Sequence, residues 1–188
     1  MDAETIIMNT FPIRDPEVRS ALVSAARIET FQPGEVISHS GDTENYLRIL
    51  IKGVVRGYMV DSAGKETTVY FVSEQSQLIT GNTLMQGIES DVEIQSLKTS
   101  QILTIPNAAT AGFRTHPEIR SLYIKYLTRV SDFQWRTKKM LYMKTARERY
   151  EWFLKEFPGL IDQVQHSYIA SFLNITPVTL SRVRHSEK

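Results

Sequence analysis

The chain has 188 residues, a formal net charge of +1 and no cysteine, which excludes disulfides, thiolate zinc sites and cysteine nucleophiles. No apolar run approaches the roughly 20 residues of a membrane-spanning helix, and no basic-then-apolar leader opens the sequence, so we expect a cytoplasmic protein without a membrane partner. Residues 1–112 carry a net −6 and residues 113–188 a net +7. This division fits a regulatory part joined to a part that binds a polyanion, and it fits equally a solvated helix surface rich in Lys and Arg.

The first two thirds of the chain are mainly strand-like. Residues 1–12 have no clear pattern, and a short helix is predicted from Asp15 to about Arg27. From Phe31 onward, short apolar runs alternate with glycine turns, as in FQPGEVISHSGD, YLRILIKGVVRGYMV and DSAGKETTVYFV. Further strands are predicted at Gln77–Ile79, Val92–Leu97 and Gln101–Ile105. Many short strands separated by turns predict an all-β barrel or sandwich.

A long helix follows, predicted from Pro117 through about Met143. One stripe of this helix has the alternating three- and four-residue spacing of a coiled-coil seam and consists of Tyr123, Tyr126, Val130, Phe133, Thr137 and Met140. A second apolar strip is suited to packing on the barrel. Few other helices are available to cover both sides, so we predict that the seam is a homodimer interface, with burial inside one chain as the alternative. A further helix is predicted from Ala146 to Phe157.

The most informative stretch runs from Gln163 to Arg184 and predicts two short helices joined by a tight turn. The first helix spans His166 to Leu173, and Asn174 supplies the left-handed conformation that a sharp turn needs. Thr176 then caps a second helix that has Pro177 at its first position. Together with the small Ala170 between the helices, this pattern favours a helix-turn-helix that binds double-stranded DNA. An αα-hairpin that binds nothing is the alternative.

The order of these segments, together with FQPGEVI, LRILIKGVVRGY, DSAGKE and NITPVTLSRVR, resembles the Crp/Fnr superfamily of transcription regulators over residues ~14–185. The resemblance implies an α+β protein with three parts. Residues 14–112 are expected to form a sensor domain, a double-stranded β-helix of the cyclic-nucleotide-binding type. Residues 113–144 are expected to form the dimerisation helix, and residues 145–188 a small all-α helix-turn-helix domain.

Three departures from the family pattern alter what the resemblance implies. Cyclic-nucleotide-binding members hold the phosphate with a Gly-Glu pair and an Arg, whereas Asn82 and Ser90 stand near those positions here, among acidic residues. Cyclic AMP is therefore not expected in the barrel, and another small-molecule effector stays open. Val178 stands where many relatives carry a base-reading glutamate, so the operator cannot be inferred. The sequence ends six residues after Arg182, so no wing is expected.

The resemblance and the helical register together predict the DNA contacts. Arg182 matches the groove-reading arginine of the family and can donate twice to a guanine. Thr176 and Thr179, near the start of the second helix, and Gln165 and Ser167, near the start of the first, are placed for phosphates. The complete predicted set is Gln165, Ser167, Thr176, Pro177, Val178, Thr179, Ser181, Arg182 and His185.

An enzyme is the first rival reading, because metal-dependent cupins share the β-helix barrel. His39 stands alone, and the other three histidines are dispersed, so no catalytic residue, metal ligand or cofactor is expected. The second rival is an interaction module or orphan-ligand sensor whose helix-turn-helix no longer binds DNA. We interpret the sequence as a homodimeric, DNA-binding transcription regulator that is not an enzyme.

Overall fold

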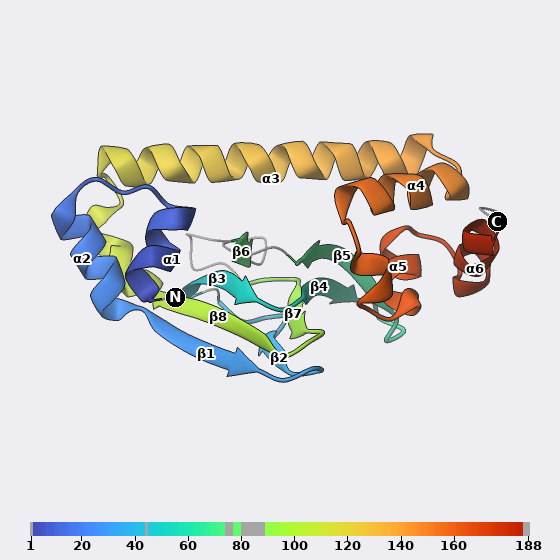
Figure 1. Ribbon diagram of the computed structural model, residues 1–188, viewed down its shortest axis with the longest axis horizontal. Helices are drawn as coiled ribbons and strands as arrows, with labels where there is room; N and C mark the ends of the chain where they lie inside the picture. Colours follow the sequence, from blue (N-terminus) through green and yellow to red (C-terminus); the bar gives the residue numbers. More distant parts are fainter. Residues whose placement is uncertain (1, 44, 74–76, 80–88, 186–188) are drawn as a thin grey trace. The chain divides into compact units, whose positions relative to one another are not determined.

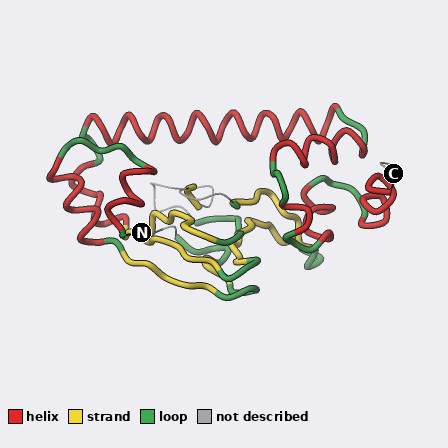
Figure 2. The backbone as a smooth tube through the Cα atoms, in the orientation of Figure 1, coloured by secondary structure: helices red, strands yellow, loops and turns green. Residues whose placement is uncertain are grey.

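The computed structural model describes residues 2–43, 45–73, 77–79 and 89–185, and within them the chain forms two compact units. The first unit comprises residues 1–59 and 71–125, and the second comprises residues 60–70 and 126–188. Helices precede and follow a central run of strands along the chain (Figure 2). In the described part of the chain, no helix combines the length and apolarity needed to cross a bilayer.

The strands form two four-stranded sheets, ordered β1-β8-β3-β6 and β2-β7-β4-β5 (Figure 1). The pairs β1–β8, β3–β8, β3–β6, β2–β7 and β4–β7 are antiparallel. The predicted double-stranded β-helix and the α+β class are confirmed. The strands are β1 (Arg27–Phe31), β2 (Val36–Ser38), β3 (Tyr46–Lys52), β4 (Val55–Val60), β5 (Glu66–Val72), β6 (Gln77–Ile79), β7 (Glu93–Ser96) and β8 (Ser100–Pro106).

Two helices at the N-terminus cover one face of the first sheet. Helix α1 (Ala3–Thr10) begins at the cap Asp2, whose carboxylate accepts from the Thr5 N–H at 2.8 Å, and α2 (Pro16–Ala25) begins at the cap Asp15. Sequence patterns predicted α2 but missed α1 and strand β1. The cluster that these helices make with the sheet consists of Ile6, Ile7, Ile13, Val18, Leu22, Ile49, Leu103 and Ile105.

The C-terminal helices agree closely with the predicted ones. After the 3₁₀ turn η1 (Asn107–Phe113), helix α3 spans Pro117–Met143 and continues from the first unit into the second. Helix α4 (Ala146–Glu156) opens with a capping box between Thr145 and Glu148, which supplies partners for otherwise unpaired backbone N–H groups. The remaining elements are the 3₁₀ turn η2 (Leu160–Asp162), α5 (His166–Phe172) and α6 (Pro177–His185).

Candidate nucleic-acid interface

The turn between α5 and α6 has the geometry that the sequence predicted. Asn174 adopts a left-handed φ of 50°, the one positive φ found outside glycine among the described residues. The N–H of Ile175 then donates to the carbonyl oxygen of Ala170 at 3.0 Å, which closes the turn against the first helix. Buried side chains join the two helices, and they are Ile169, Ala170, Phe172, Leu173 and Leu180.

The second helix is capped by a hydroxyl. Thr176 Oγ1 accepts from the Thr179 N–H at 3.1 Å and lies 2.9 Å from Thr179 Oγ1. The cap satisfies a donor that the first turn of a helix would otherwise leave unpaired, and Pro177 at the first position lacks such a donor altogether. Both features hold the start of α6 in a defined orientation.

An aromatic cluster attaches the helix-turn-helix to α4. The ring of Phe172, on α5, stacks on Trp152 with centroids 6.2 Å apart and meets Phe157 edge-on at 5.7 Å. Phe153, fully buried, lies 6.1 Å from the same ring. Sequence analysis predicted the helix from Ala146 to Phe157 but missed the burial of Phe172, because α5 has only seven residues and its apolar stripe is too short to mark every buried position.

Arg149 on α4 is a further residue that sequence reasoning missed. Its Nη1 donates to the carbonyl oxygens of Leu173 at 3.0 Å and Asn174 at 3.3 Å, and its Nε donates to the carbonyl oxygen of Lys144 at 3.0 Å. Carbonyl groups at the end of a helix have no partner within the helix, and charged donors are strong partners for them. Arg149 therefore fixes the turn of the helix-turn-helix to the start of α4.

The structure places the nine predicted DNA-contacting residues within one unit, on α5, α6 and the residues that precede them. Thr179 is half-buried. The other eight are exposed to solvent, and they are Gln165, Ser167, Thr176, Pro177, Val178, Ser181, Arg182 and His185. Exposure on a buried and capped frame is what groove contact requires.

Two basic residues near the end of α6 make contacts of their own. Arg184 is half-buried, and its Nη1 lies 3.0 Å from Nε2 of His166 at the start of α5. His185 Nδ1 lies 2.7 Å from the carbonyl oxygen of Ser181, one turn earlier on the same helix. Arg184 thus points back toward the first helix, whereas the structure shows Arg182 exposed to solvent.

The seam predicted along α3 is largely covered by the chain itself. Thr137 is 7% exposed and Met140 is 0% exposed, so neither offers a surface to a second copy. Phe133 meets Phe157 edge-on with centroids 6.2 Å apart, and it is half-buried together with Tyr123, Tyr126 and Val130. The burial of Thr137 and Met140 is not compatible with their predicted interface role, and Phe157 is one neighbour on this side of α3 that the sequence pattern did not reveal.

A different stripe of α3 faces solvent. Trp135 is 70% exposed and Tyr142 is 81% exposed, and Ile124 and Leu127 are exposed on the same helix. The intervals of 3, 8 and 7 residues from Ile124 to Tyr142 return to one side of a helix that has 3.6 residues per turn. We call these residues, Ile124, Leu127, Trp135 and Tyr142, the exposed α3 stripe, and exposed apolar side chains that share one side of a helix are candidates for an interaction surface.

The segment that would hold a cyclic-nucleotide phosphate lies partly outside the described residues, Asn82 among them. Ser90 is described and buried, and its hydroxyl is engaged locally with the N–H of Val92 at 3.1 Å and the carbonyl oxygen of Val92 at 3.2 Å. Asp91 is exposed. Across the described ranges, His, Asp and Glu side chains nowhere gather in threes as a metal site would require.

Comparison with known proteins finds a matching domain family and solved structures with a similar fold. Residues 28–115 match the family model of the cyclic nucleotide-binding domain. Among solved structures, the chain resembles FixK2 from Bradyrhizobium japonicum with a TM-score of 0.72 and 18% identity, covering 86% of this chain and 83% of that one. No curated protein sequence matches the chain.

Two further structures share the fold. CLP from Xanthomonas campestris, described as a c-di-GMP-responsive global regulator, has a TM-score of 0.73 and 12% identity, with coverage of 92% and 91%. A Eubacterium rectale protein described as a transcriptional regulator of the Crp/Fnr family has a TM-score of 0.71 and 17% identity, with coverage of 95% and 87%. The fold predicted from the sequence is thereby confirmed as that of the Crp/Fnr regulators.

Proposed function

We propose that this chain, whose residues 28–115 match the family model of the cyclic nucleotide-binding domain, is a DNA-binding transcription regulator of the Crp/Fnr type. Helix α6 enters the major groove of double-stranded DNA, and Arg182 reads a base edge there. Thr176, Gln165 and Ser167 contact phosphates on either side. No catalytic activity is part of this proposal.

One observation is the main support for the proposal that α5 and α6 bind DNA. Eight of the nine residues that the helical register assigns to DNA are exposed, while Ile169, Leu173 and Leu180, which lie between them, are buried. A hairpin that served only to bury a seam would not need a capped second helix that exposes Ser181, Arg182 and His185 to solvent. The basic excess of residues 113–188, a net +7, favours a polyanionic partner.

The protein acts as a homodimer in this proposal. The exposed α3 stripe packs on the same stripe of a second copy across a two-fold axis, because a helix that presents four large apolar side chains to water is stabilised by covering them. At about 100° per residue, Tyr126, Val130 and Phe133 of the seam predicted from the sequence lie on the opposite side of α3 from this stripe, so they take no part in the proposed contact. A dimer also matches the symmetry of a palindromic operator.

Cyclic AMP and cyclic GMP are not the effectors that we propose. Glu89, Asp91 and Glu93 lie around Ser90, where a phosphate would need a cation, and carboxylates repel it. Calorimetric titration of the purified protein with each nucleotide, up to millimolar concentration, tests this directly. Saturable micromolar binding would contradict it.

Fluorescence anisotropy with random-sequence duplex DNA tests the DNA proposal. We expect binding whose logarithmic affinity falls linearly with the logarithm of salt concentration, because bound Lys and Arg release counterions from the phosphates. Selection from a random duplex pool should then yield a two-fold symmetric site. A dimeric protein that fails to bind duplex DNA even at low salt would instead favour the interaction module.

A further inference from the structure

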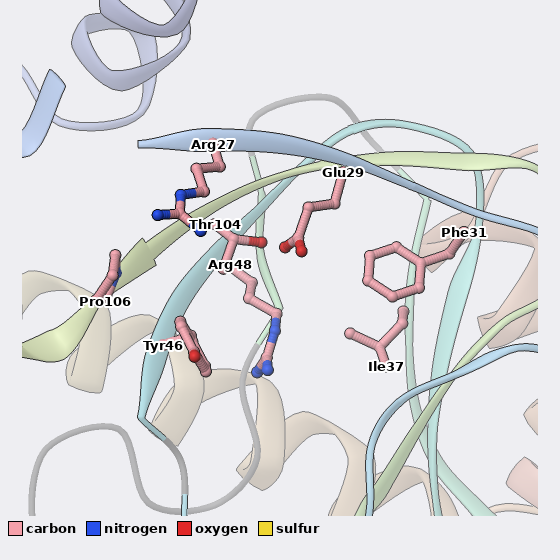
Figure 3. A pocket seen from close by; sticks show the side chains of 8 residues that line it. All are labelled: Arg27, Glu29, Phe31, Ile37, Tyr46, Arg48, Thr104 and Pro106. Atoms are coloured by element: carbon pink, nitrogen blue, oxygen red, sulfur yellow. The ribbon is translucent and has the colours of Figure 1, made fainter. Parts of the chain in front are cut away.

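A cavity of about 430 Å³ opens in the first unit between strands β1, β2, β3 and β8 (Figure 3). Its volume is within the usual range of small-molecule sites, which is roughly 300–1,000 Å³. The described residues that line it lie outside residues 78–97, the stretch that matches the phosphate-binding segment of cyclic-nucleotide-binding relatives. These described residues are the basis of a candidate site that does not use the phosphate-binding positions of the family.

The strand register places one hydroxyl between two arginines. Thr104 on β8 pairs with Arg27 on β1 and with Arg48 on β3, so the three residues form one row across the sheet. Residues paired in this way have Cβ atoms roughly 4.5–5.5 Å apart on one face. The three side chains therefore line the cavity from neighbouring strands.

The Thr104 hydroxyl is the unexplained group in this row. Its side chain is 6% exposed, and among the described residues its Oγ1 has no hydrogen-bond partner. A buried polar atom without a partner is unfavourable, and most such atoms in native proteins are paired. Figure 3 shows the Thr104 hydroxyl directed into the same space as the Glu29 carboxylate. A ligand atom in the cavity would give this hydroxyl its partner.

The charged residues that line the cavity favour an anionic ligand. Arg48 is only 8% exposed, and its guanidinium carbon lies 5.2 Å from the centroid of the Tyr46 ring, so this cation is held in a largely desolvated place. Arg27 adds a second positive charge and Glu29 one negative charge. Paired guanidinium groups favour carboxylates and phosphates, which accept two parallel hydrogen bonds.

The opposite wall of the cavity is apolar. Phe31 at the end of β1 and Ile37 on β2 face one another across from the arginines (Figure 3). One side of the site thus carries charged donors, and the other carries an aromatic ring and a branched aliphatic chain. Such a site suits a molecule that has an anionic group at one end and an apolar body at the other.

We propose that this cavity binds a small organic anion. Its carboxylate or phosphate contacts Arg27, Arg48 and Thr104, its apolar body lies against Phe31 and Ile37, and Glu29 accepts from a hydroxyl or amine that the molecule carries. This site would give the barrel an effector that is chemically unlike a cyclic nucleotide. The proposal does not depend on DNA binding, because the cavity lies in the first unit and is tested on the protein alone.

The test is calorimetric titration of the full chain without DNA, using benzoate, phenyl phosphate and neutral benzamide up to about 20 mM. We expect saturable binding of at least one anion and none of benzamide, and the tighter anion identifies the headgroup. Arg27→Gln should weaken that binding about tenfold, the usual effect of losing a charge-assisted hydrogen bond. Arg27 is exposed, so this variant should fold normally.

Thr104→Val separates a binding role from a structural one. Replacing a buried hydroxyl that has no protein partner by a methyl group should leave the Tm unchanged or raise it, yet weaken anion binding. Thr137→Val is the matched control, because Thr137 Oγ1 is also buried without a partner but lies on α3, outside the cavity lining. The proposal is overturned if neither anion saturates, if benzamide binds equally well, or if Arg27→Gln and Thr104→Val leave anion affinity unchanged.

Discussion

The hydroxyl of Ser171 on α5 accepts a hydrogen bond from the backbone N–H of Thr68 at 2.9 Å and lies 3.3 Å from the carbonyl oxygen of Glu66. Glu66 and Thr68 belong to β5, which stands at the end of its sheet and therefore has an open edge. One side chain of the helix-turn-helix thus satisfies both a donor and an acceptor of an edge strand, as a neighbouring strand would.

Removing this hydroxyl should loosen the strand more than the helix. Ser171→Ala leaves the Thr68 N–H without this acceptor, and we expect a loss of about 1 kcal/mol in the free energy of unfolding. Amide hydrogen exchange at Thr68 should accelerate. Ser167→Ala, an exposed serine on the same helix, is the control and should stay within about 0.5 kcal/mol of wild type. Equal exchange rates at Thr68 in all three proteins would contradict the assigned role.

Arg149 offers a second test of how the helix-turn-helix is held. Arg149→Ala removes the donor to two carbonyl groups at the end of α5, so we expect a loss of about 1–3 kcal/mol in the free energy of unfolding, together with weaker DNA binding. Arg147→Ala, which breaks only an exposed pair with Glu151 at 3.0 Å, should cost less than about 1 kcal/mol. If chemical denaturation finds the two variants equally stable, Arg149 is not a positioning residue.

The sequence predicted elements well where their signals are local. Pro177 after Thr176, Asn174 at the turn and the long periodicity of α3 each act within a few residues, and the structure has these elements in the predicted places. Helix α1 was missed because its eight residues carry little periodic signal, and its burial depends on a sheet made by residues far along the chain. Strand β1 was missed because its residues are mostly exposed.

The residues of the candidate site also fall into those that local sequence spacing predicts and those that it does not. Outward residues such as Arg182 follow from the spacing of their buried neighbours, which is local information. The contacts of Arg149, Ser171 and Phe172 join residues from separate elements, and the sequence carries no sign of them. The α3 seam was misjudged at Thr137 and Met140 because periodicity shows which side of a helix is apolar but not which neighbour covers it.

The dimer proposal can be tested by charging the exposed α3 stripe. Leu127→Asp combined with Trp135→Asp places two carboxylates in the proposed contact, and we expect a monomer by sedimentation velocity at about 10 µM protein. Both side chains are exposed in the single chain, so the variant should keep its fold. Arg129→Asp, a charge reversal at an exposed position on the opposite side of the same helix, is the control and should weaken the dimer less. A wild-type chain that sediments as a monomer would remove the basis for the proposal.

The cap of α2 should make stability depend on pH. Backbone N–H donation from Val18 and Glu17, together with the nearby ring of His116, lowers the pKa of Asp15 despite some opposing burial. A carboxyl group whose pKa is lowered on folding stabilises the protein above its unfolded pKa, and that stability is lost as the pH falls through the folded pKa. The pKa of Glu148, at the cap of α4, is lowered in the same direction by its bond from the Thr145 N–H.

Asp15→Asn keeps a capping oxygen but removes the titrating group. We expect the free-energy difference between wild type and Asp15→Asn, measured by urea unfolding, to shrink as the pH falls into the acid range, because the protonated aspartic acid no longer has the charge that the cap favours. Two curves that stay parallel from neutral pH into acid would show that Asp15 does not contribute to the pH dependence.

Arg182 provides the sharpest test of the DNA interface, because two substitutions at this residue separate the effect of its charge from that of its planar guanidinium group. Arg182→Ala should lower affinity for the selected operator by about 1–3 kcal/mol and relax the preference at one base position in each half-site. Arg182→Lys keeps the charge but loses the planar pair of donors, so it should lose operator preference while keeping the salt dependence. Thr179→Ala, near the helix start, should instead weaken binding to all sequences about equally.

Anisotropy titrations on the operator and on a scrambled duplex, each at several salt concentrations, give the operator preference and the salt dependence of every variant. If Arg182→Lys behaves as wild type on both, Arg182 contacts a phosphate, and the register that places it in the groove is wrong.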